Sequence, residues 1–110
     1  MTFTLDLSFN VKRYTMHGMI QTFKCDDTRA LFAGHRVPRF VNIRSVAERN
    51  LAMLHRSIRL EDLRIPANNR LEALQGDRKG QYSIRINDPW RICFRFEGGH
   101  AWDVQIVACH

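Results

Sequence analysis

The sequence predicts a single α+β domain in which helices cover one face of an antiparallel β-sheet. The first half of the chain holds two helical patterns, and the second half, after residue 69, alternates apolar and polar residues between turns. Because successive side chains of a strand point to opposite faces, each strand has an apolar face that helices must cover. A chain of 110 residues is long enough to bury one core without disulfide bonds.

Arginine dominates the basic residues. The net charge is +6, and 14 of the 17 basic residues are arginine. The planar guanidinium binds phosphate through paired hydrogen bonds and stacks on bases, which favours a polyanionic partner. A genome rich in G and C, which raises the number of arginine codons everywhere, accounts for the same composition equally well.

The cysteines and the lengths of the apolar runs indicate the cellular compartment in which the protein is expected. Cys25, Cys93 and Cys109 form no close pair and show no metal-site spacing. No apolar run approaches the roughly 20 residues that span a bilayer, and the N-terminus lacks the pattern of a signal peptide. We therefore expect a cytoplasmic protein with reduced thiols and no membrane association.

Residues 1–18 are predicted to precede the main domain, which we expect to cover residues 19–110. Apolar side chains alternate here with polar ones in the pattern of a half-buried strand: Phe3, Leu5, Leu7, Phe9 and Val11. The segment is either an added edge strand or an extension upstream of the domain. A second short strand is predicted over residues 19–24.

Two helices are predicted next. Asp26 or Asp27 is expected to cap a short helix over residues 28–33, and Gly34 to end it. A longer helix is predicted over residues 41–57. Its apolar residues recur at steps of three and four and form one stripe: Ile43, Val46, Ala47, Leu51, Leu54 and Ile58.

Four strands are predicted over residues 70–74, 81–87, 90–96 and 101–107, separated by turns rich in Gly, Asn and Asp. The apolar face is expected to carry Tyr82, Ile84, Ile86, Trp90, Ile92, Phe94, Trp102 and Ile106. The opposite, uncovered face is expected to carry Arg70, Glu72, Arg85, Arg91 and Arg95. A basic open face of this kind suits a polyanion.

The string NRLEALQGDRKGQYSIRINDPWRICFRF, residues 69–96, is long and ordered. Together with residues 19–24, the helical string SVAERNLAML and the terminal histidine, it resembles the HigB toxins of the RelE/ParE superfamily. The resemblance implies a RelE-like fold and a ribosome-dependent messenger-RNA endonuclease that needs no metal or other cofactor. It also implies a HigA-like helix-turn-helix antitoxin as partner, with operator DNA reached only through that antitoxin.

The resemblance also implies roles for individual residues. Arg91 matches the phosphate-handling arginine of the family, and His110 matches its C-terminal catalytic histidine. Glu72 lies where some relatives carry an active-site histidine, and it is either a general base or an ion-pair partner of the arginines. Relatives commonly end in Asp-Tyr-His, whereas this chain ends in Ala108, Cys109 and His110.

Metal-free RNA cleavage needs a base for the 2′-hydroxyl, positive charge on the phosphate and an acid for the leaving 5′-oxygen. Arg85 and Arg91 are expected to bind the phosphate; the alternative is a cross-strand ion-paired surface with Glu72 and Asp103. The remaining basic residues of the sheet and its turns are expected to contact RNA: Arg70, Arg78, Lys79 and Arg95. Candidates for an outer contact zone lie on the long helix: Arg44, Arg49 and Arg56.

Two other functions stay open from the sequence. The first is a toxin-fold protein with little nuclease activity that joins its antitoxin on operator DNA as a co-repressor. The altered ending at Ala108 and Cys109 favours this function. The second is a gyrase-poisoning toxin on the same superfold. The basic face and the terminal histidine count against this second function.

Overall fold

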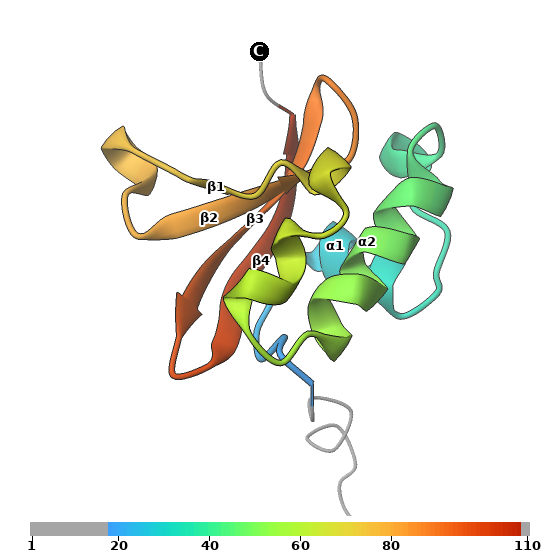
Figure 1. Cartoon of the computed structure of the whole chain (residues 1–110). Coiled ribbons are helices and arrows are strands. Elements are labelled where there is room, and N and C mark those ends of the chain that lie inside the picture. Colours follow the sequence, from blue (N-terminus) through green and yellow to red (C-terminus); the bar gives the residue numbers. More distant parts are fainter. Residues whose placement is uncertain (1–17, 109–110) are drawn as a thin grey trace, which may run out of the picture.

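The computed structural model describes residues 18–108 as two packed layers (Figure 1). One layer is a four-stranded antiparallel sheet in the order β1-β2-β3-β4, and helices α1 and α2 lie on one face of it. The elements are α1 (Asp26–Phe32), α2 (Arg44–Arg56), β1 (Glu72–Ala73), β2 (Gln81–Arg85), β3 (Trp90–Glu97) and β4 (His100–Ala108). The predicted α+β architecture is therefore confirmed.

Two predicted features lie outside the described part of the chain. They are the alternating segment within residues 1–17 and the terminal His110. The choice between an edge strand and an upstream extension therefore stays a prediction, as does the domain boundary at residue 19.

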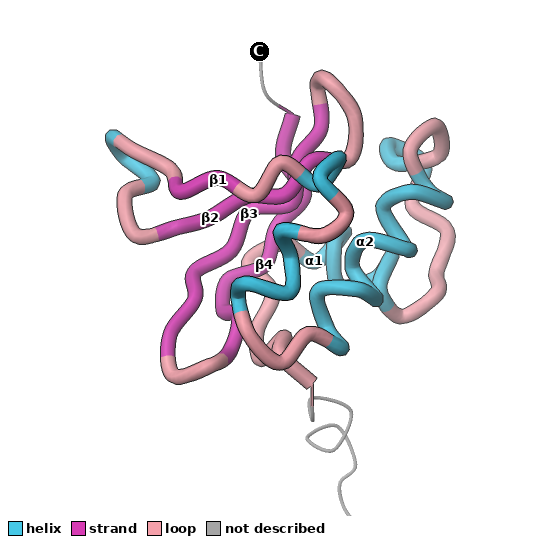
Figure 2. The backbone as a smooth tube through the Cα atoms, viewed as in Figure 1, coloured by secondary structure: helices cyan, strands magenta, loops and turns pink. Residues whose placement is uncertain are grey.

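The strands form a meander in which each strand pairs with the next one along the chain, as the tube in Figure 2 shows. Arg85 of β2 lies opposite Arg91 of β3, and Gln81 lies opposite Arg95. Directly opposite residues share a face of the sheet. The predicted alternation of arginine and apolar residues on these two strands is therefore confirmed.

The core lies between the apolar face of the sheet and α2. The sheet contributes side chains that are at most 1% exposed: Ile84, Ile92, Phe94, Val104 and Ile106. Helix α2 contributes side chains that are fully buried: Ala47, Leu51 and Leu54. Tyr82 stacks on Phe94 with ring centroids 6.2 Å apart, and Trp90 packs edge-on against Phe40 at 5.6 Å.

A β-bulge in β4 changes the face on which Trp102 lies. The register between β3 and β4 shifts between Cys93 and Arg95, and Asp103 has a left-handed backbone with φ of 55°. Trp102 therefore lies opposite Arg95, and its indole Nε1 donates a hydrogen bond to the Glu97 carbonyl oxygen at 3.0 Å. The prediction that Trp102 belongs to the apolar face is wrong, because one extra residue inverts the alternation beyond it.

Residues 19–24 lie along the outer edge of β4 but do not form the predicted strand. Two isolated parallel bridges, Ile20 with Ala101 and Phe23 with Val104, replace a continuous ladder. The bulge described above lies between these bridges, so this edge of β4 does not offer the evenly spaced partners that a parallel strand needs.

Helix α1 begins slightly earlier than predicted. Its N-cap is Cys25 and neither Asp26 nor Asp27, because both aspartates lie in the first turn, where their charge suits the helix dipole. Gly34 follows the C-cap with φ of 95°, and its N–H donates to the Leu31 carbonyl oxygen at 3.0 Å. The predicted glycine stop is therefore confirmed.

Helix α2 begins later than predicted, at Arg44 instead of residue 41. A short 3-10 helix, Pro38–Phe40, and a turn precede it. The connector to the sheet contains two further 3-10 helices, Leu60–Arg64 and Ala67–Asn69. These turns bring the chain from the helical layer back to the edge of the sheet.

Strands β1 and β2 are shorter than predicted, and each has a local cause. Arg70 has a left-handed backbone with φ of 46°, so β1 starts only at Glu72. Strand β2 ends at Arg85 because the chain turns at once into β3: the Asn87 side-chain oxygen accepts a hydrogen bond from the Trp90 N–H at 3.0 Å.

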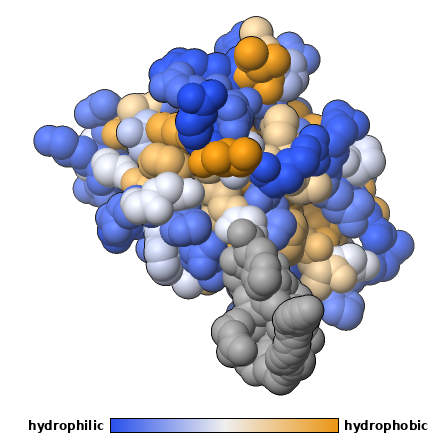
Figure 3. All heavy atoms as spheres, turned by 60° about the horizontal axis from the view of Figure 1, so that its bottom comes forward, coloured by the Kyte–Doolittle hydropathy of each residue, from blue (hydrophilic) through white to orange (hydrophobic). Residues whose placement is uncertain are grey.

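The described surface carries charge, with isolated apolar side chains among it. Figure 3 shows one face of the molecule with small hydrophobic areas surrounded by hydrophilic ones. The large apolar side chains that are exposed are Val41, Ile58 and Ile65. Among residues 18–108, no helix is both long and apolar enough to cross a membrane.

Candidate active site

Arg91 extends from β3 across β2 toward β1. Its Nε–H donates a hydrogen bond to Ser83 Oγ at 2.7 Å, and its Nη2 donates to the Arg70 carbonyl oxygen, also at 2.7 Å. The Glu72 carboxylate lies 3.6 Å from Nη2 and forms an ion pair. These partners define the orientation of the guanidinium and leave part of its N–H donors for a ligand.

Arg85 lies opposite Arg91 on the neighbouring strand. Its Nη2 contacts the Asp88 carboxylate at 2.6 Å. This hydrogen bond and the charge of Arg85 lower the pKa of the Asp88 carboxyl, and the charge of Arg70 adds to the effect. Asp88 therefore remains ionised at a lower pH than an ordinary aspartate, and Arg70 lies close enough to influence it.

Three arginines and two carboxylates thus gather at this end of the sheet. We call Arg70, Arg85, Arg91, Glu72 and Asp88 the arginine cluster. Its charge is positive overall, and its guanidinium groups come from adjacent strands. Arg70, Arg85, Arg91 and Glu72 thus lie together, and of the two alternatives for Glu72 the structure shows the ion pair with Arg91. The roles of these residues in RNA binding and cleavage stay predictions.

Strand β4 ends beside the arginine cluster. Val107 lies opposite Arg91, and Ala108, the last residue of the strand, lies opposite Trp90. His110 follows two residues later, outside the described part of the chain. Its association with the cluster therefore stays a prediction.

The arginine-bearing face is less open than predicted. Ser83 and Cys93, which lie opposite each other in its middle, are 0% and 2% exposed. The Arg91 side chain, which bonds to Ser83, is itself only 14% exposed. An arginine that folds flat over a strand covers the small side chains beneath it with its aliphatic stem.

The other predicted RNA-binding residues lie toward the opposite end of the sheet: Arg78, Lys79 and Arg95. Arg95 lies opposite Gln81, separated from Arg91 by about 13 Å of strand. It pairs with Glu97, which raises the pKa of the Arg95 guanidinium. Arg78 donates a hydrogen bond to Gln81 Oε1 at 3.1 Å. The structure therefore separates the predicted site into two groups.

A cavity of about 420 Å³ lies between α2 and the end of β2. Arg49, Arg56 and Arg85 line it together with apolar residues of α2 and the β2 end. Asn50 of α2 donates a hydrogen bond from Nδ2 to the Arg85 carbonyl oxygen at 2.9 Å. The cavity thus connects the basic side of α2 with the arginine cluster. Arg44, by contrast, forms an ion pair with Glu48 at 3.1 Å.

Comparison with known proteins identifies the family. The sequence model of the HigB-like toxin family matches residues 12–108. This family is described as RelE-like toxins of the type II toxin–antitoxin system HigB. The chain belongs to this family. The resemblance drawn from residues 69–96 and the RelE-like fold are thereby confirmed.

Two curated relatives of the HigB-like chain match part of it. The protein named Toxin HigB-1 from Vibrio cholerae serotype O1 is 40% identical over 60 residues, which are 54% of this chain and 63% of the relative. An uncharacterized protein from Haemophilus influenzae is 38% identical over 56 residues, which are 51% of this chain and 55% of the relative. The chain therefore spans less than two thirds of the length of either relative.

Ser83 is the residue of this HigB-like site that the sequence did not reveal. In an alternating strand, a serine between two apolar residues is one more polar side chain on the solvent face. The available signal was its position two residues before Arg85, on the face that Arg91 shares. Among the described residues, no group of three or more His, Cys, Asp or Glu side chains has the arrangement of a metal site.

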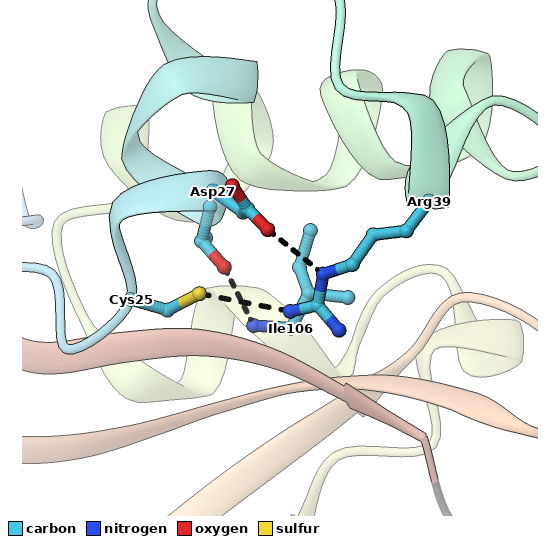
Figure 4. A network of polar contacts seen from close by, with 5 residues as sticks. Cys25, Asp27, Arg39 and Ile106 are labelled. Carbon is cyan, nitrogen blue, oxygen red and sulfur yellow. Dashed lines mark hydrogen bonds and ion pairs between the residues drawn. The ribbon is translucent and has the colours of Figure 1, made fainter.

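A second polar network, at the start of α1, was also not predicted (Figure 4). Arg39 donates from Nε to Asp27 Oδ2 at 2.9 Å and from Nη2 to Cys25 Sγ at 3.7 Å. Partial burial raises the pKa of the Cys25 thiol, but hydrogen bonds from Thr28, Asp27 and Arg39 together outweigh burial and lower that pKa. Thr28 Oγ1 also accepts a hydrogen bond from the Ile106 N–H at 3.0 Å, which joins α1 to β4.

We expect Cys25 to react with iodoacetamide at a lower pH in the folded protein than in the unfolded chain. The thiolate is the reacting form and its fraction rises with pH, so a lowered pKa moves the midpoint of the reaction to lower pH. Mass spectrometry of the alkylated peptides measures this midpoint, with buried Cys93 as internal control. Arg39→Ala should raise the midpoint. Identical midpoints in the folded and unfolded states would contradict the assignment.

Proposed function

We propose that this HigB-like protein is a ribosome-dependent messenger-RNA endonuclease. The observation that supports the proposal best is the arginine cluster, in which the Arg91 guanidinium is held by Ser83 and Arg70 and lies opposite Arg85. Donors fixed in advance around a phosphate stabilise the charge of a transition state without a reorganisation cost. Family membership supports the toxin role, and translating ribosomes as substrate would place its action in the cytoplasm.

In the proposed reaction, the ribose 2′-oxygen attacks the adjacent phosphorus and the bond from phosphorus to the 5′-oxygen breaks. A base takes the 2′-hydroxyl proton, and an acid protonates the leaving 5′-oxygen. The products are a 2′,3′-cyclic phosphate and a 5′-hydroxyl end. Arg91 and Arg85 neutralise the pentacoordinate phosphate, and Arg70 adds positive charge beside them.

His110 and Glu72 are the proposed acid–base residues. Histidine titrates near neutral pH without perturbation, and β4 ends at Ala108, close to Arg91, so the C-terminal residues start beside the cluster. Glu72 already forms an ion pair with Arg91 and is 57% exposed, so an incoming phosphate would compete with its carboxylate. We therefore assign His110 the larger share of proton transfer, with Glu72 as base or as ion-pair partner.

The remaining basic residues extend the proposed RNA contact. Arg78, Lys79 and Arg95 lie toward the far end of the sheet, where they would bind phosphates of the messenger or of ribosomal RNA. Each phosphate neutralised by a basic residue adds affinity that falls as salt is raised. The proposed protein partner is a HigA-like helix-turn-helix antitoxin, through which the complex would reach operator DNA; the net charge of +6 would attract acidic segments of it.

The test is a cleavage assay with purified protein and ribosomes programmed with a defined messenger. We expect cleavage within the messenger only when ribosomes translate it, and none of the same RNA alone. Mapping of the new ends by primer extension measures the result. Cleavage that proceeds equally without ribosomes, or no cleavage under translation, would contradict the proposal.

The alternative is a weakly active or inactive toxin fold that serves as co-repressor with its antitoxin. Ala108 and Cys109 stand where relatives commonly have an acidic and an aromatic residue, which favours this alternative. The same assay separates the two functions. A co-repressor leaves the messenger intact while it forms a tight complex with the antitoxin and operator DNA.

A further inference from the structure

We propose that Ser83 and Asn69 are positioning residues that fix the Arg91 guanidinium for phosphate binding. The inference rests on the proposed endonuclease function and extends it to residues that do not contact the RNA. Two hydrogen bonds from separate elements orient Arg91, one to a side chain of β2 and one to a backbone carbonyl at the end of a turn. Each of these two partners has its own anchor in the fold.

The first anchor is Ser83. Its side chain is fully buried on β2, and its Oγ accepts the Arg91 Nε–H at 2.7 Å. A buried hydroxyl group needs a hydrogen-bond partner, and here that partner is Arg91. The Nε atom is the point where the flexible stem of arginine joins the planar guanidinium, so a bond at Nε defines the plane of the whole group.

The second anchor is the carbonyl oxygen of Arg70, which accepts from Arg91 Nη2 at 2.7 Å. Arg70 has φ of 46° and ψ of 57°, a left-handed conformation that residues other than glycine adopt rarely. Such a conformation persists where its surroundings hold it. The Arg70 N–H donates to the Ala67 carbonyl oxygen at 3.0 Å, which closes the 3-10 turn Ala67–Asn69.

Asn69 holds this turn in place. It is 4% exposed, and its Nδ2 donates to the Leu63 carbonyl oxygen at 3.1 Å and contacts Met53 Sδ at 3.5 Å. Leu63 belongs to the preceding 3-10 helix and Met53 to α2, so Asn69 ties the turn to the helical layer. The orientation of Arg91 thus depends on a chain of contacts that starts in α2 and passes through Asn69 and Arg70.

The chemical consequence is a guanidinium that does not need to be ordered when RNA binds. The Nε and Nη2 atoms of Arg91 are engaged within the protein by Ser83 and the Arg70 carbonyl, and the guanidinium retains further N–H donors for a phosphate. Misplacement of a reacting group by about 1 Å costs on the order of 100-fold in rate. A purely structural role, in which Arg91 only joins β3 to β2 and to the turn before β1, predicts a loss of stability without a specific loss of turnover.

The experiment compares Ser83→Ala, Ser83→Thr and Asn69→Ala with the parent chain. We expect Ser83→Ala and Asn69→Ala to lower kcat for messenger cleavage by roughly 10- to 100-fold, with KM for programmed ribosomes changed by less than about threefold. Ser83→Thr keeps the hydroxyl and should restore most of the activity. In ¹⁵N NMR spectra, the Arg91 Nε–H should exchange with water much faster in Ser83→Ala than in the parent.

Thr28→Val is the matched control. Thr28 is also fully buried, and its hydroxyl accepts the Ile106 N–H and makes no hydrogen bond to Arg91, so this variant loses a comparable bond without removing a partner of the arginine cluster. Its kcat and its Arg91 Nε–H signal should match those of the parent. Arg70→Asn adds a second comparison, since asparagine tolerates the left-handed backbone: turnover should fall through the lost charge, while the Arg91 Nε–H signal should match that of the parent.

An unchanged kcat together with a protected Arg91 Nε–H in Ser83→Ala would overturn the inference. So would equal losses of kcat in Ser83→Ala and Thr28→Val, because stability alone would then explain both. If the parent chain itself does not cleave messenger RNA, the proposed function fails. The exchange rate of the Nε–H still decides in that case whether Ser83 and Asn69 position Arg91.

Discussion

Replacement of Arg91 by alanine should lower messenger cleavage by about 10²–10³-fold, which is the usual effect of removing one fixed donor from a transition-state site. The guanidinium lies opposite Arg85 and is oriented by Ser83 and the Arg70 carbonyl. Its loss removes positive charge at the proposed phosphate site and leaves Glu72 without its ion-pair partner. The growth arrest expected when the parent chain is expressed without antitoxin should then be relieved.

The control for this prediction is Arg29→Ala. Arg29 is an exposed arginine of α1 that pairs with Asp26, so the change removes one positive charge far from the arginine cluster. Its cleavage rate should remain within about twofold of the parent, because an exposed ion pair contributes little to stability. Circular dichroism verifies that both variants are folded. An Arg91→Ala protein as toxic as the parent would show that the site is wrongly assigned.

Phe94→Ala should be the most destabilising single change in the core. Phe94 is fully buried on β3 and stacks with Tyr82 at 6.2 Å between ring centroids. Truncation of a buried phenylalanine removes its transfer free energy and leaves a cavity, together about 3–5 kcal/mol. This is a large share of the roughly 5–15 kcal/mol by which domains of this size are stable.

Urea denaturation measures this loss as a change in the free energy of unfolding. Val41→Ala is the comparison, since Val41 is 47% exposed and its truncation should cost less than about 0.5 kcal/mol. A Phe94→Ala protein that unfolds at nearly the same urea concentration as the parent would contradict the described core.

The alternating pattern made the sheet and half of the site predictable from the sequence. Strand periodicity determines the face of each side chain, so Arg85 and Arg91 were expected together and lie opposite each other. The turn residues between the strands, such as Asn87, set the hairpins and hence the order of the sheet. The helical stripe likewise predicted α2 and its buried Ala47, Leu51 and Leu54. Its last member, Ile58, was wrongly included, because the helix ends at Arg56 and Ile58 is 80% exposed.

What the pattern cannot show is the local departure from it. The bulge at Asp103 moves Trp102 to the other face of the sheet. The alternation of apolar and polar residues in this strand does not indicate the extra residue. The left-handed backbone of Arg70 depends on contacts of Asn69 with Met53 and Leu63, which belong to other elements of the fold. Ser83 acquires its role only when Arg91 folds across β2.

Two of these departures, at Arg70 and at Ser83, meet at the arginine cluster. A regular strand through residues 70–74 would direct the backbone of Arg70 into the ladder, away from the position that accepts the Arg91 hydrogen bond. The short β1 is therefore part of the site, because it frees this carbonyl oxygen for Arg91. Arg78, Lys79 and Arg95 form a distinct basic group, because they lie toward the other end of the sheet.

The most direct test of the account uses a programmed ribosome whose messenger carries a single 2′-deoxynucleotide at the mapped cleavage position. The account predicts that the parent protein no longer cuts at this position, because the attacking 2′-hydroxyl is gone, while it still binds the ribosome. The unmodified messenger should yield an upstream fragment with a 2′,3′-cyclic phosphate. Continued cleavage at the deoxy position, or a 3′-hydroxyl on the upstream fragment, would contradict a reaction in which the arginine cluster promotes attack by the 2′-oxygen.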